Sequence, residues 1–259
     1  MQTDIHGKVA FVTGAANGIG RAIARRLADN GASLAIADID IANAERMAAS
    51  LPRAIACHVD IRDEVAIAAA VARTIDRFGR LDILVNNAGV NTFAHRVDID
   101  LFPIEEWHRI ISVDLDGLFL VSRGALKPML ERGEGGVIVN IASVVGLAAM
   151  RLQSPFVAAK AGIIHLTRSM ALELGAKGVR VNAVAPGSIM TDGTRKLFYG
   201  EDGSFHARMQ AFMDHIPLAR PGTVDEIAEA VLFLAAPESR YVNGHVMTVD
   251  GGWTAGYMM

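Results

Sequence analysis

The chain of 259 residues has a single cysteine, Cys57, and few charged residues for its length. One cysteine can form neither a disulfide within the chain nor a cysteine metal cluster, and Cys57 stands in an apolar stretch where we expect it to pack as a small hydrophobic side chain. The net charge is −3, and no basic stripe favours binding of nucleic acid or of an anionic membrane. The eight histidines form no HExxH pair, so we expect no metal site.

Long apolar runs are also missing. No run reaches the roughly 18 residues that a membrane-spanning helix needs. Residues 1–8 are polar and lack the apolar core of a signal peptide, so we expect a cytoplasmic protein. Hydrophobic residues nevertheless make up 51% of the chain, which supplies a substantial core and makes disorder a poor interpretation.

Predicted strands and helices alternate along nearly the whole sequence. Repeated β–α–β units indicate an α/β fold with a doubly wound parallel sheet and helices on both faces. No linker or internal repeat interrupts the alternation, so we expect one domain over residues 1–259. Strands are predicted at 9–13, 33–38, 54–59, 83–86, 136–141, 180–184 and 245–249, and helices at 18–30, 41–51, 62–78, 104–132, 155–177 and 224–235.

One stretch, at about 188–221, breaks this alternation and is rich in glycine and phenylalanine. It follows the end of a predicted strand, where ligands bind in open α/β sheets. Insertions of this size are often lids over a site. We interpret the stretch as a substrate lid, with a surface excursion or a subunit contact as the alternatives.

A glycine-rich turn joins the first strand to the first helix in the stretch KVAFVTGAANGIG, residues 8–20. A helix that begins near Gly18 directs free N–H groups and a partial positive charge at the turn, which suits a phosphate-bearing ligand. The alternative is that the glycines serve only the geometry of the turn. The second strand ends in Asp38, about twenty residues further on, where a ribose-binding carboxylate is expected. Asp38 could instead cap the helix that starts at Ile41.

Further motifs follow in order: Asn86-Asn87-Ala88-Gly89 at the end of the fourth strand, Ser143 after the fifth, Phe156-x-x-x-Lys160 in the next helix, and Pro186-Gly187 after the sixth strand. With Gly14-x-x-x-Gly18-x-Gly20, they make the chain resemble the short-chain dehydrogenase/reductase family over almost its whole length. The resemblance implies a Rossmann-type, seven-stranded parallel sheet of order 3-2-1-4-5-6-7, a nicotinamide cofactor, a small-molecule substrate and a homodimer or homotetramer, of which we expect the tetramer.

The resemblance also implies which residues bind the cofactor. Asp38 would accept hydrogen bonds from a free ribose 2′-hydroxyl and repel a 2′-phosphate, and Ile39 beside it is no arginine, so NAD is favoured over NADP. Lys160 would bind the nicotinamide ribose, and Asp60 and Ile61 would lie by the adenine. The other matched positions are Gly14, Asn17, Gly18, Ile19 and Gly20 at the pyrophosphate turn, Asn87, Ala88 and Gly89 after the fourth strand, and Pro186, Gly187, Ile189 and Thr191 towards the carboxamide.

The family uses a Ser–Tyr–Lys catalytic set assisted by an Asn, and two of these four positions differ here. Ser143 and Lys160 match, and the Ser143 hydroxyl would hydrogen-bond the substrate oxygen. Phe156 stands at the tyrosine position and has no proton to transfer, a loss that typically costs about 10²–10⁴ in rate. We therefore expect a chain that binds the cofactor and turns over poorly.

Three interpretations of Phe156 are open: a deliberate Tyr-to-Phe change in an active enzyme, a natural, catalytically silent member, or a mechanism that uses another proton donor. The first is preferred because the change removes one oxygen while every flanking residue fits the family. Asp114 stands where the family usually has Asn, which orients a water in a proton relay from the lysine. Asp114 could hold that water, and its charge would favour a protonated Lys160. The alternative is a tolerated variation on a helix that faces the sheet.

The substrate is expected to lie between Ser143 and Phe156, against the segments 91–96 and 145–153. A lining with cationic groups favours a sugar, sugar acid or polyol with a secondary hydroxyl, since Arg151 could hold a carboxylate bidentately. Arg195 and Lys196 on the lid could add charge. The alternative for each cation is a solvated surface position, and the alternative function is a catalytically silent NAD(H)-binding sensor. The predicted substrate-binding residues are His95, Val145, Arg151 and Gln153.

Overall fold

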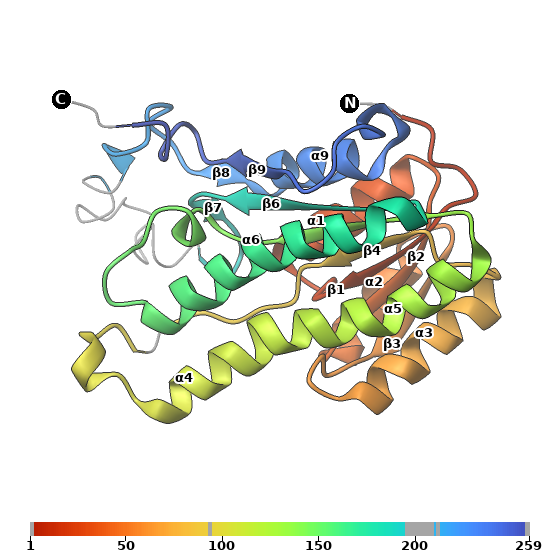
Figure 1. The fold of residues 1–259 in the computed structure, drawn as a ribbon, viewed down its shortest axis with the longest axis horizontal. Helices are drawn as coiled ribbons and strands as arrows, with labels where there is room; N and C mark the ends of the chain where they lie inside the picture. Colours follow the sequence, from red (N-terminus) through yellow and green to blue (C-terminus); the bar gives the residue numbers. More distant parts are fainter. Residues whose placement is uncertain (1–2, 93–94, 195–209, 211–212, 257–259) are drawn as a thin grey trace.

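A sheet of seven parallel strands forms the centre of the computed structural model, which describes residues 3–92, 95–194, 210 and 213–256 (Figure 1). The predicted order is confirmed, with β9 as the seventh strand, because the short strands β7 and β8 pair with each other in a separate two-stranded sheet. The strands are, in spatial order, β3 (Ala54–His58), β2 (Ser33–Asp38), β1 (Val9–Thr13), β4 (Ile83–Asn86), β5 (Gly136–Ile141), β6 (Val179–Pro186) and β9 (Val246–Val249), with β7 (Ile189–Met190) and β8 (Gly222–Thr223) apart.

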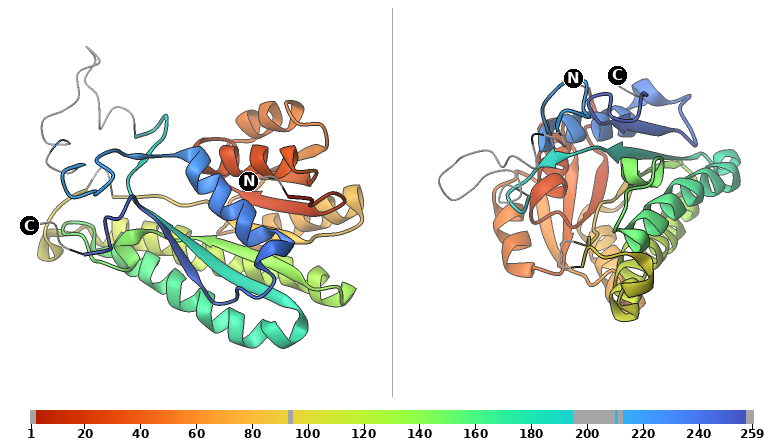
Figure 2. Two further views of the ribbon diagram at one scale, coloured as in Figure 1. Left: turned by 90° about the horizontal axis from the view of Figure 1, so that it is seen from above. Right: turned by 90° about the vertical axis from the view of Figure 1, so that its left-hand side faces the viewer.

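Helices cover both faces of this sheet (Figures 1 and 2). One apolar core packs Ile23, Leu27 and Val231 against the strands, and a second core on the other face contains Ile67 and Met129. Apolar residues therefore line β1 on both sides, as a short apolar run predicts. The helices are α1 (Gly18–Asp29), α2 (Ile41–Ala49) and α9 (Val224–Ala235) on the first face, and α3 (Glu64–Phe78), α4 (Ile104–Ile111), α5 (Leu118–Arg132) and α6 (Ser154–Leu174) on the second.

One predicted helix is wrong as a continuous element. The stretch 104–132 forms α4 and α5 with a π-helical turn, Ser112–Gly117, between them. Other element limits differ from the prediction by a few residues. The helix predicted from 62 begins at Glu64, because the Asp63 carboxylate accepts the N–H groups of Val65 and Ala66 and so caps it.

Two further expectations concern single segments. Cys57 is buried, and burial raises the pKa of its thiol, as expected for a small core side chain. Half of the predicted lid at 188–221 lies outside the described residues, and its first part contains β7. Of the helices that the structure describes, none combines the length and apolarity that crossing a membrane requires.

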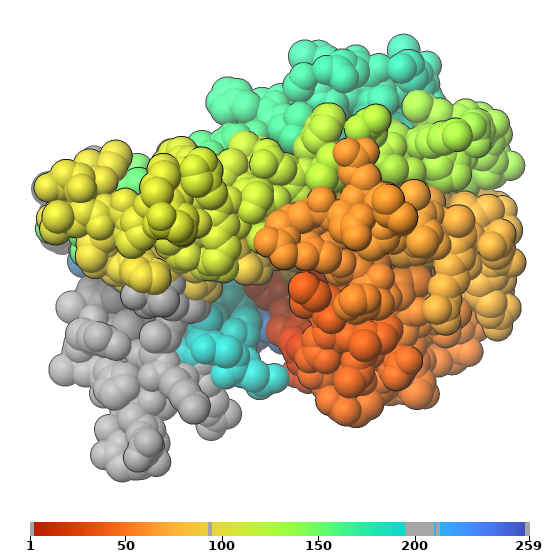
Figure 3. Space-filling view, turned by 90° about the horizontal axis from the view of Figure 1, so that it is seen from below, coloured from red at the N-terminus to blue at the C-terminus, as the bar shows by residue number. Residues whose placement is uncertain are grey.

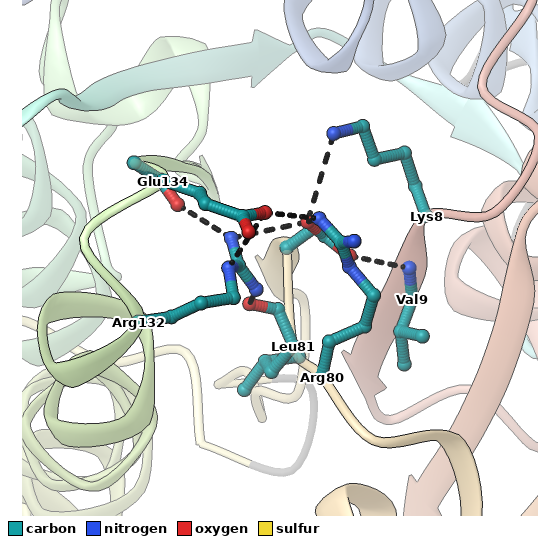
Figure 4. A network of polar contacts seen from close by, with 8 residues as sticks. Lys8, Val9, Arg80, Leu81, Arg132 and Glu134 are labelled. Carbon is teal, nitrogen blue, oxygen red and sulfur yellow. Dashed lines mark hydrogen bonds and ion pairs between the residues drawn. The ribbon is translucent and has the colours of Figure 1, made fainter.

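A network of charges closes the amino-terminal edge of the sheet, where β1, β4 and β5 begin (Figure 4). Asp82, which is 4% exposed, accepts hydrogen bonds from the Val9 N–H at 2.9 Å and from both Nε and Nη2 of Arg80 at 2.8 and 2.7 Å. Arg132 Nη2 lies 3.1 Å from the same carboxylate. Burial alone would raise the pKa of Asp82, but the bonds from Arg80 and Val9 outweigh it, and the pKa is lowered.

Asp82→Asn is expected to lower the free energy of unfolding by about 3 kcal/mol at neutral pH, because it removes the buried counter-charge of Arg80 and Arg132 and leaves them only the exposed Glu134. The folded pKa of Asp82 lies below its unfolded value of about 4. Its contribution is therefore complete above about pH 4 and is lost as the pH falls through the folded pKa. Chemical denaturation of both proteins between about pH 3 and pH 7 should show a difference that shrinks in acid.

The matched control is Asp98→Asn, which removes an exposed carboxylate paired with Arg151 at 3.0 Å. That change is expected to cost less than about 1 kcal/mol. Equal losses in the two variants would contradict a stabilising role for the Asp82 network.

Candidate active site

The glycine-rich turn after β1 passes close to the end of β4. Gly14 has φ +62°, and a Cβ there would lie 2.8 Å from the Ala88 Cα. A Cβ on Gly20 would lie 2.2 Å from the Gly14 carbonyl oxygen. Gly18 has φ +53°, and a Cβ there would meet only Thr191, at 3.9 Å. Close packing within the protein thus requires glycine at positions 14 and 20, whereas at position 18 the positive φ favours it.

Asn87 fastens this turn to β4. Its Nδ2 donates to the carbonyl oxygens of Thr13 at 2.9 Å and Gly14 at 3.0 Å. The Thr13 hydroxyl in turn accepts the N–H groups of Asn87 and Ala88, each at 3.0 Å. The residues after β4 therefore hold the turn in place.

The amino terminus of α1 offers its N–H groups to a ligand. Asn17 is the N-cap but makes no side-chain capping bond, and the first turn has no acidic residue. Asp38, at the end of β2, accepts the Ala16 N–H at 2.9 Å, which ties its carboxylate to the turn. An uncapped helix end and a nearby carboxylate fit the diphosphate and ribose of a dinucleotide.

Asp38 does not cap α2. The cap is Asp40, whose carboxylate accepts the Asn43 N–H at 3.1 Å, so the capping alternative for Asp38 is wrong. Asp38 Oδ1 instead accepts the N–H of Asp40 at 2.9 Å.

The two residues predicted by the adenine follow β3. The Asp60 carboxylate accepts from Arg62 Nε at 3.0 Å, and this bond lowers the pKa of Asp60. Ile61 is buried against Gly117, where a Cβ would approach its Cδ1 to 2.7 Å. Neither side chain lines the central cavity, so the predicted adenine contacts stay predictions.

A cavity of about 610 Å³ brings together most of the other predicted site residues. The space-filling view shows the molecule hollowed between the orange surface of its first elements and the cyan segment near residue 190 (Figure 3). Ile189 and Thr191 of that segment belong to the cavity wall. The predicted residues on the wall are Ile19, Asn87, Gly89, Ser143, Val145, Gln153, Phe156, Lys160, Pro186, Gly187, Ile189 and Thr191.

Lys160 and Asp114 form a buried ion pair beside this cavity. Lys160 Nζ lies 3.0 Å from Asp114 Oδ2, and the two side chains are 7% and 0% exposed. Lys160 Nζ also donates to the Ile141 carbonyl at 3.5 Å. Its distance to the centre of the Phe156 ring is 5.3 Å, so the prediction that residues 156 and 160 share a helix face is confirmed.

The π-helical turn Ser112–Gly117 carries Asp114. Such turns occur frequently at functional sites. Asp114 Oδ1 accepts the Val90 N–H at 2.7 Å, and a Cβ on Gly89 would lie 3.2 Å from Oδ2. The absence of a side chain at Gly89 leaves room for the Asp114 carboxylate. The hydrogen bond from the Val90 N–H then holds it beside Lys160.

Ser143 sits at the start of a one-turn 3₁₀ helix, Val144–Gly146. Its Oγ accepts the Val145 N–H at 3.3 Å, which leaves the hydroxyl proton for a ligand. Sequence reasoning missed Gly146, where a Cβ would lie 2.6 Å from the backbone carbon of Lys160. In the sequence, Gly146 is marked only by its place three residues after Ser143. Because it has no side chain, the turn that bears Ser143 can pack against α6.

The four predicted substrate-binding residues divide into two groups. Val145 and Gln153 line the cavity, and Gln153 is 5% exposed with its Oε1 3.4 Å from the Thr92 hydroxyl. His95 and Arg151 do not line it. His95 Nδ1 lies 3.8 Å from Glu106 Oε1, and Arg151 pairs with Asp98 with 78% of its side chain exposed.

Three other findings complete the site. Arg195 and Lys196 lie outside the described residues. Trp253 lines the cavity and was missed, because a tryptophan after the last strand has no periodic signal. In the part of the chain that the structure describes, no three His, Cys, Asp or Glu side chains gather as a metal site would require.

Comparison with known proteins finds matches over nearly the whole chain. A family model described as Enoyl-(Acyl carrier protein) reductase matches residues 14–254. Cis-4-hydroxycyclohexanecarboxylate dehydrogenase of Sinomonas cyclohexanicum is 41% identical over 253 residues, which cover 96% of this chain and 97% of that protein. Meso-2,3-butanediol dehydrogenase of Serratia marcescens is 38% identical over 250 residues, with 96% and 95% covered. D-threitol dehydrogenase of Mycolicibacterium smegmatis is 38% identical over 256 residues, with 96% and 94% covered.

Proposed function

Since the chain belongs to the short-chain dehydrogenase/reductase family of oxidoreductases, we propose that it uses NAD to interconvert a secondary alcohol and a ketone on a polyol, a sugar or a hydroxylated acid. The observation that carries this proposal is a single cavity. Ser143 and Lys160 face it from one side, and Ile19 and Thr191 continue it towards the glycine-rich turn.

Oxidation of a secondary alcohol removes a hydride from carbon and a proton from oxygen. When bound, NAD supplies the hydride acceptor. The Ser143 hydroxyl donates a hydrogen bond to the substrate oxygen and so orients it. Lys160, held by Asp114, binds the ribose beside the reacting centre. The Phe156 ring fills the position of the proton-transferring tyrosine and has no group to accept the proton, so we propose that this chain is slow at that transfer.

The relatives support the substrate class. They are dehydrogenases of a hydroxycyclohexanecarboxylate, of a butanediol and of threitol. The cavity wall carries polar groups from Gln153, Asn91 and Arg96. It also carries apolar groups from Val145, Met150 and Trp253. A small substrate with hydroxyl groups and a short carbon frame matches both kinds of wall.

Asp38 supports NAD over NADP. Its carboxylate is held beside the turn by the N–H groups of Ala16 and Asp40, both at 2.9 Å, so it cannot swing away from a cofactor. A fixed negative charge there repels a 2′-phosphate.

A second candidate function is a catalytically silent NAD(H)-binding sensor. The specific observation in its favour is Phe156, which leaves the cofactor site intact and removes the proton-transferring group. We rank it second because Ser143 and Lys160 still face the cavity.

The prediction that separates the two functions is Phe156→Tyr. Restoring the phenol is expected to raise kcat for NAD reduction by about 100- to 10,000-fold, because it returns a positioned acid and base. The measurement is NADH formation on a panel of polyols, sugar acids, hydroxy acids and apolar alcohols. Phe78→Tyr at the end of α3, outside the cavity, is the matched control and should leave the rate unchanged.

Intact NADH binding without turnover on any substrate would favour the sensor. Activity confined to steroids or apolar alcohols would contradict the substrate class.

A second prediction concerns Asp38→Asn. Removing this charge is expected to raise the affinity for NADPH relative to NADH by about 10-fold, because the repulsion of the 2′-phosphate is gone. Fluorescence titration with both nucleotides measures the ratio. Asp63→Asn, at the cap of α3, is the control and should leave the ratio unchanged. An unaltered protein that binds both nucleotides equally would overturn the assignment to NAD.

We also propose a homotetramer, as the family resemblance implies. Phe119 on α5 and Leu172 on α6 are 49% and 86% exposed on the same face of the sheet, and burying them against another copy would remove apolar surface from water. Light scattering should therefore give the mass of four chains, and Leu172→Glu should shift the population to smaller species. A single-chain mass for the unaltered protein would refute the proposal.

A further inference from the structure

The two departures from the family's catalytic set meet at Lys160. Its ammonium lies 5.3 Å from the centre of the Phe156 ring and 3.0 Å from Asp114 Oδ2. Phenylalanine at position 156 can carry no charge, whereas the carboxylate at position 114 brings one. The negative charge next to the lysine therefore comes from position 114 in this chain.

The place of this carboxylate is fixed on both sides. Oδ1 accepts the Val90 N–H at 2.7 Å, and the charge on Oδ2 is directed at Lys160. Among the described residues, Oδ2 has no hydrogen-bond partner besides this charge contact. Because both side chains are buried, solvent screens their interaction poorly, and the pair forms a nearly neutral unit on the cavity side of α6.

The other cation that interacts with Asp114 is compensated separately. Glu106 holds Arg109 through Nε at 2.6 Å and Nη2 at 2.7 Å, and these bonds raise the pKa of Arg109, with a smaller coulombic contribution from Asp114. Asp114 is thus left as the counter-ion of Lys160.

We propose that Asp114, acting through Lys160, sets the preference of the site between oxidised and reduced cofactor. The inference rests on the proposed function, namely that this cavity binds NAD. The oxidised nicotinamide ring carries a positive charge and the reduced ring is neutral, while the rest of the two molecules is the same. A lone ammonium on the cavity wall disfavours the cationic ring, and an ammonium neutralised by Asp114 does not.

This gives Asp114 a role as a positioning residue for the charge of Lys160, separate from proton transfer. A site that binds the oxidised cofactor without this penalty suits an enzyme that works in the direction of alcohol oxidation.

The test is Asp114→Asn, which keeps the size of the side chain and the oxygen that accepts the Val90 N–H. Dissociation constants for NAD and NADH, measured by calorimetry at one pH and ionic strength, give the ratio of Kd for NAD to Kd for NADH. The variant is expected to raise this ratio by about 10-fold or more. The Lys160 ammonium then lacks its counter-ion in a poorly screened site and weakens binding of the cationic NAD ring. The double variant Asp114→Asn with Lys160→Met removes both charges and should return the ratio to that of the unaltered protein.

Asp60→Asn is the matched control. It removes a carboxylate at the predicted adenine end, where the two cofactors are identical, so both affinities should change alike. Thermal melting checks that each variant is folded, and the double variant, in which no charge is left unpaired, tests the ratio independently of the single one.

The outcomes distinguish the proposed function from the inference about Asp114. An unaltered protein that binds neither NAD nor NADH overturns the proposed function. Binding of both with an unchanged ratio in Asp114→Asn overturns the inference about Asp114 and leaves the proposed function standing. A raised ratio in the single variant that persists in the double variant also overturns it, because the effect would then not act through Lys160.

Discussion

The close contact between the end of β1 and the end of β4 is the constraint on which the site depends. These two strands are neighbours at the point where the strand order reverses, β3-β2-β1 on one side and β4-β5-β6 on the other. The crevice of an open α/β sheet lies at such a point. Asn87 bridges it with two hydrogen bonds to the backbone of Thr13 and Gly14. Glycine at position 14 follows from this contact, since a Cβ would enter the backbone of Ala88.

Paired charges lie at both ends of the parallel strands, and their effects differ. At the amino-terminal edge, Asp82 is surrounded by donors from Arg80, Arg132 and the backbone, so the network is closed and its effect is on stability. At the carboxyl edge, the pair of Lys160 and Asp114 borders a cavity. A charge beside a cavity is close enough to act on a bound ligand, which is the basis of the role in cofactor preference that we propose for Asp114.

Hydrophobic periodicity and glycine positions were enough to predict the parallel α/β fold and most element limits, because the apolar faces of β1, α1 and α9 can pack in few ways. The strand order was implied by the resemblance to the family. The predicted Ser143, Phe156 and Lys160 come together because each follows or belongs to an element whose place the fold determines. The π-helical turn could not be predicted, since an added residue in a helix leaves the apolar residues on either side with ordinary helical spacing.

Long surface side chains were the other limit of prediction from sequence. Arg151 was expected at the substrate and instead pairs with Asp98, and His95 lies near Glu106. Both partners are carboxylates from segments whose spatial neighbours the sequence does not specify. The short side chain of Asn87 instead bonds the backbone of Thr13 and Gly14, so its position follows more directly from the fold.

Charge balance and proton transfer are separable tasks at this centre, and the chain treats them differently. A carboxylate 3.0 Å from Lys160 can replace the charge of a phenolate, because electrostatic compensation needs only proximity in a poorly screened site. Proton transfer is a separate task, because it needs direct or water-bridged hydrogen-bond contact with the substrate oxygen. One carboxylate oxygen of Asp114 accepts the Val90 N–H, and the other pairs with the Lys160 ammonium. Under the proposed function, a site built in this way retains cofactor binding, while its chemical step depends on the residue at position 156.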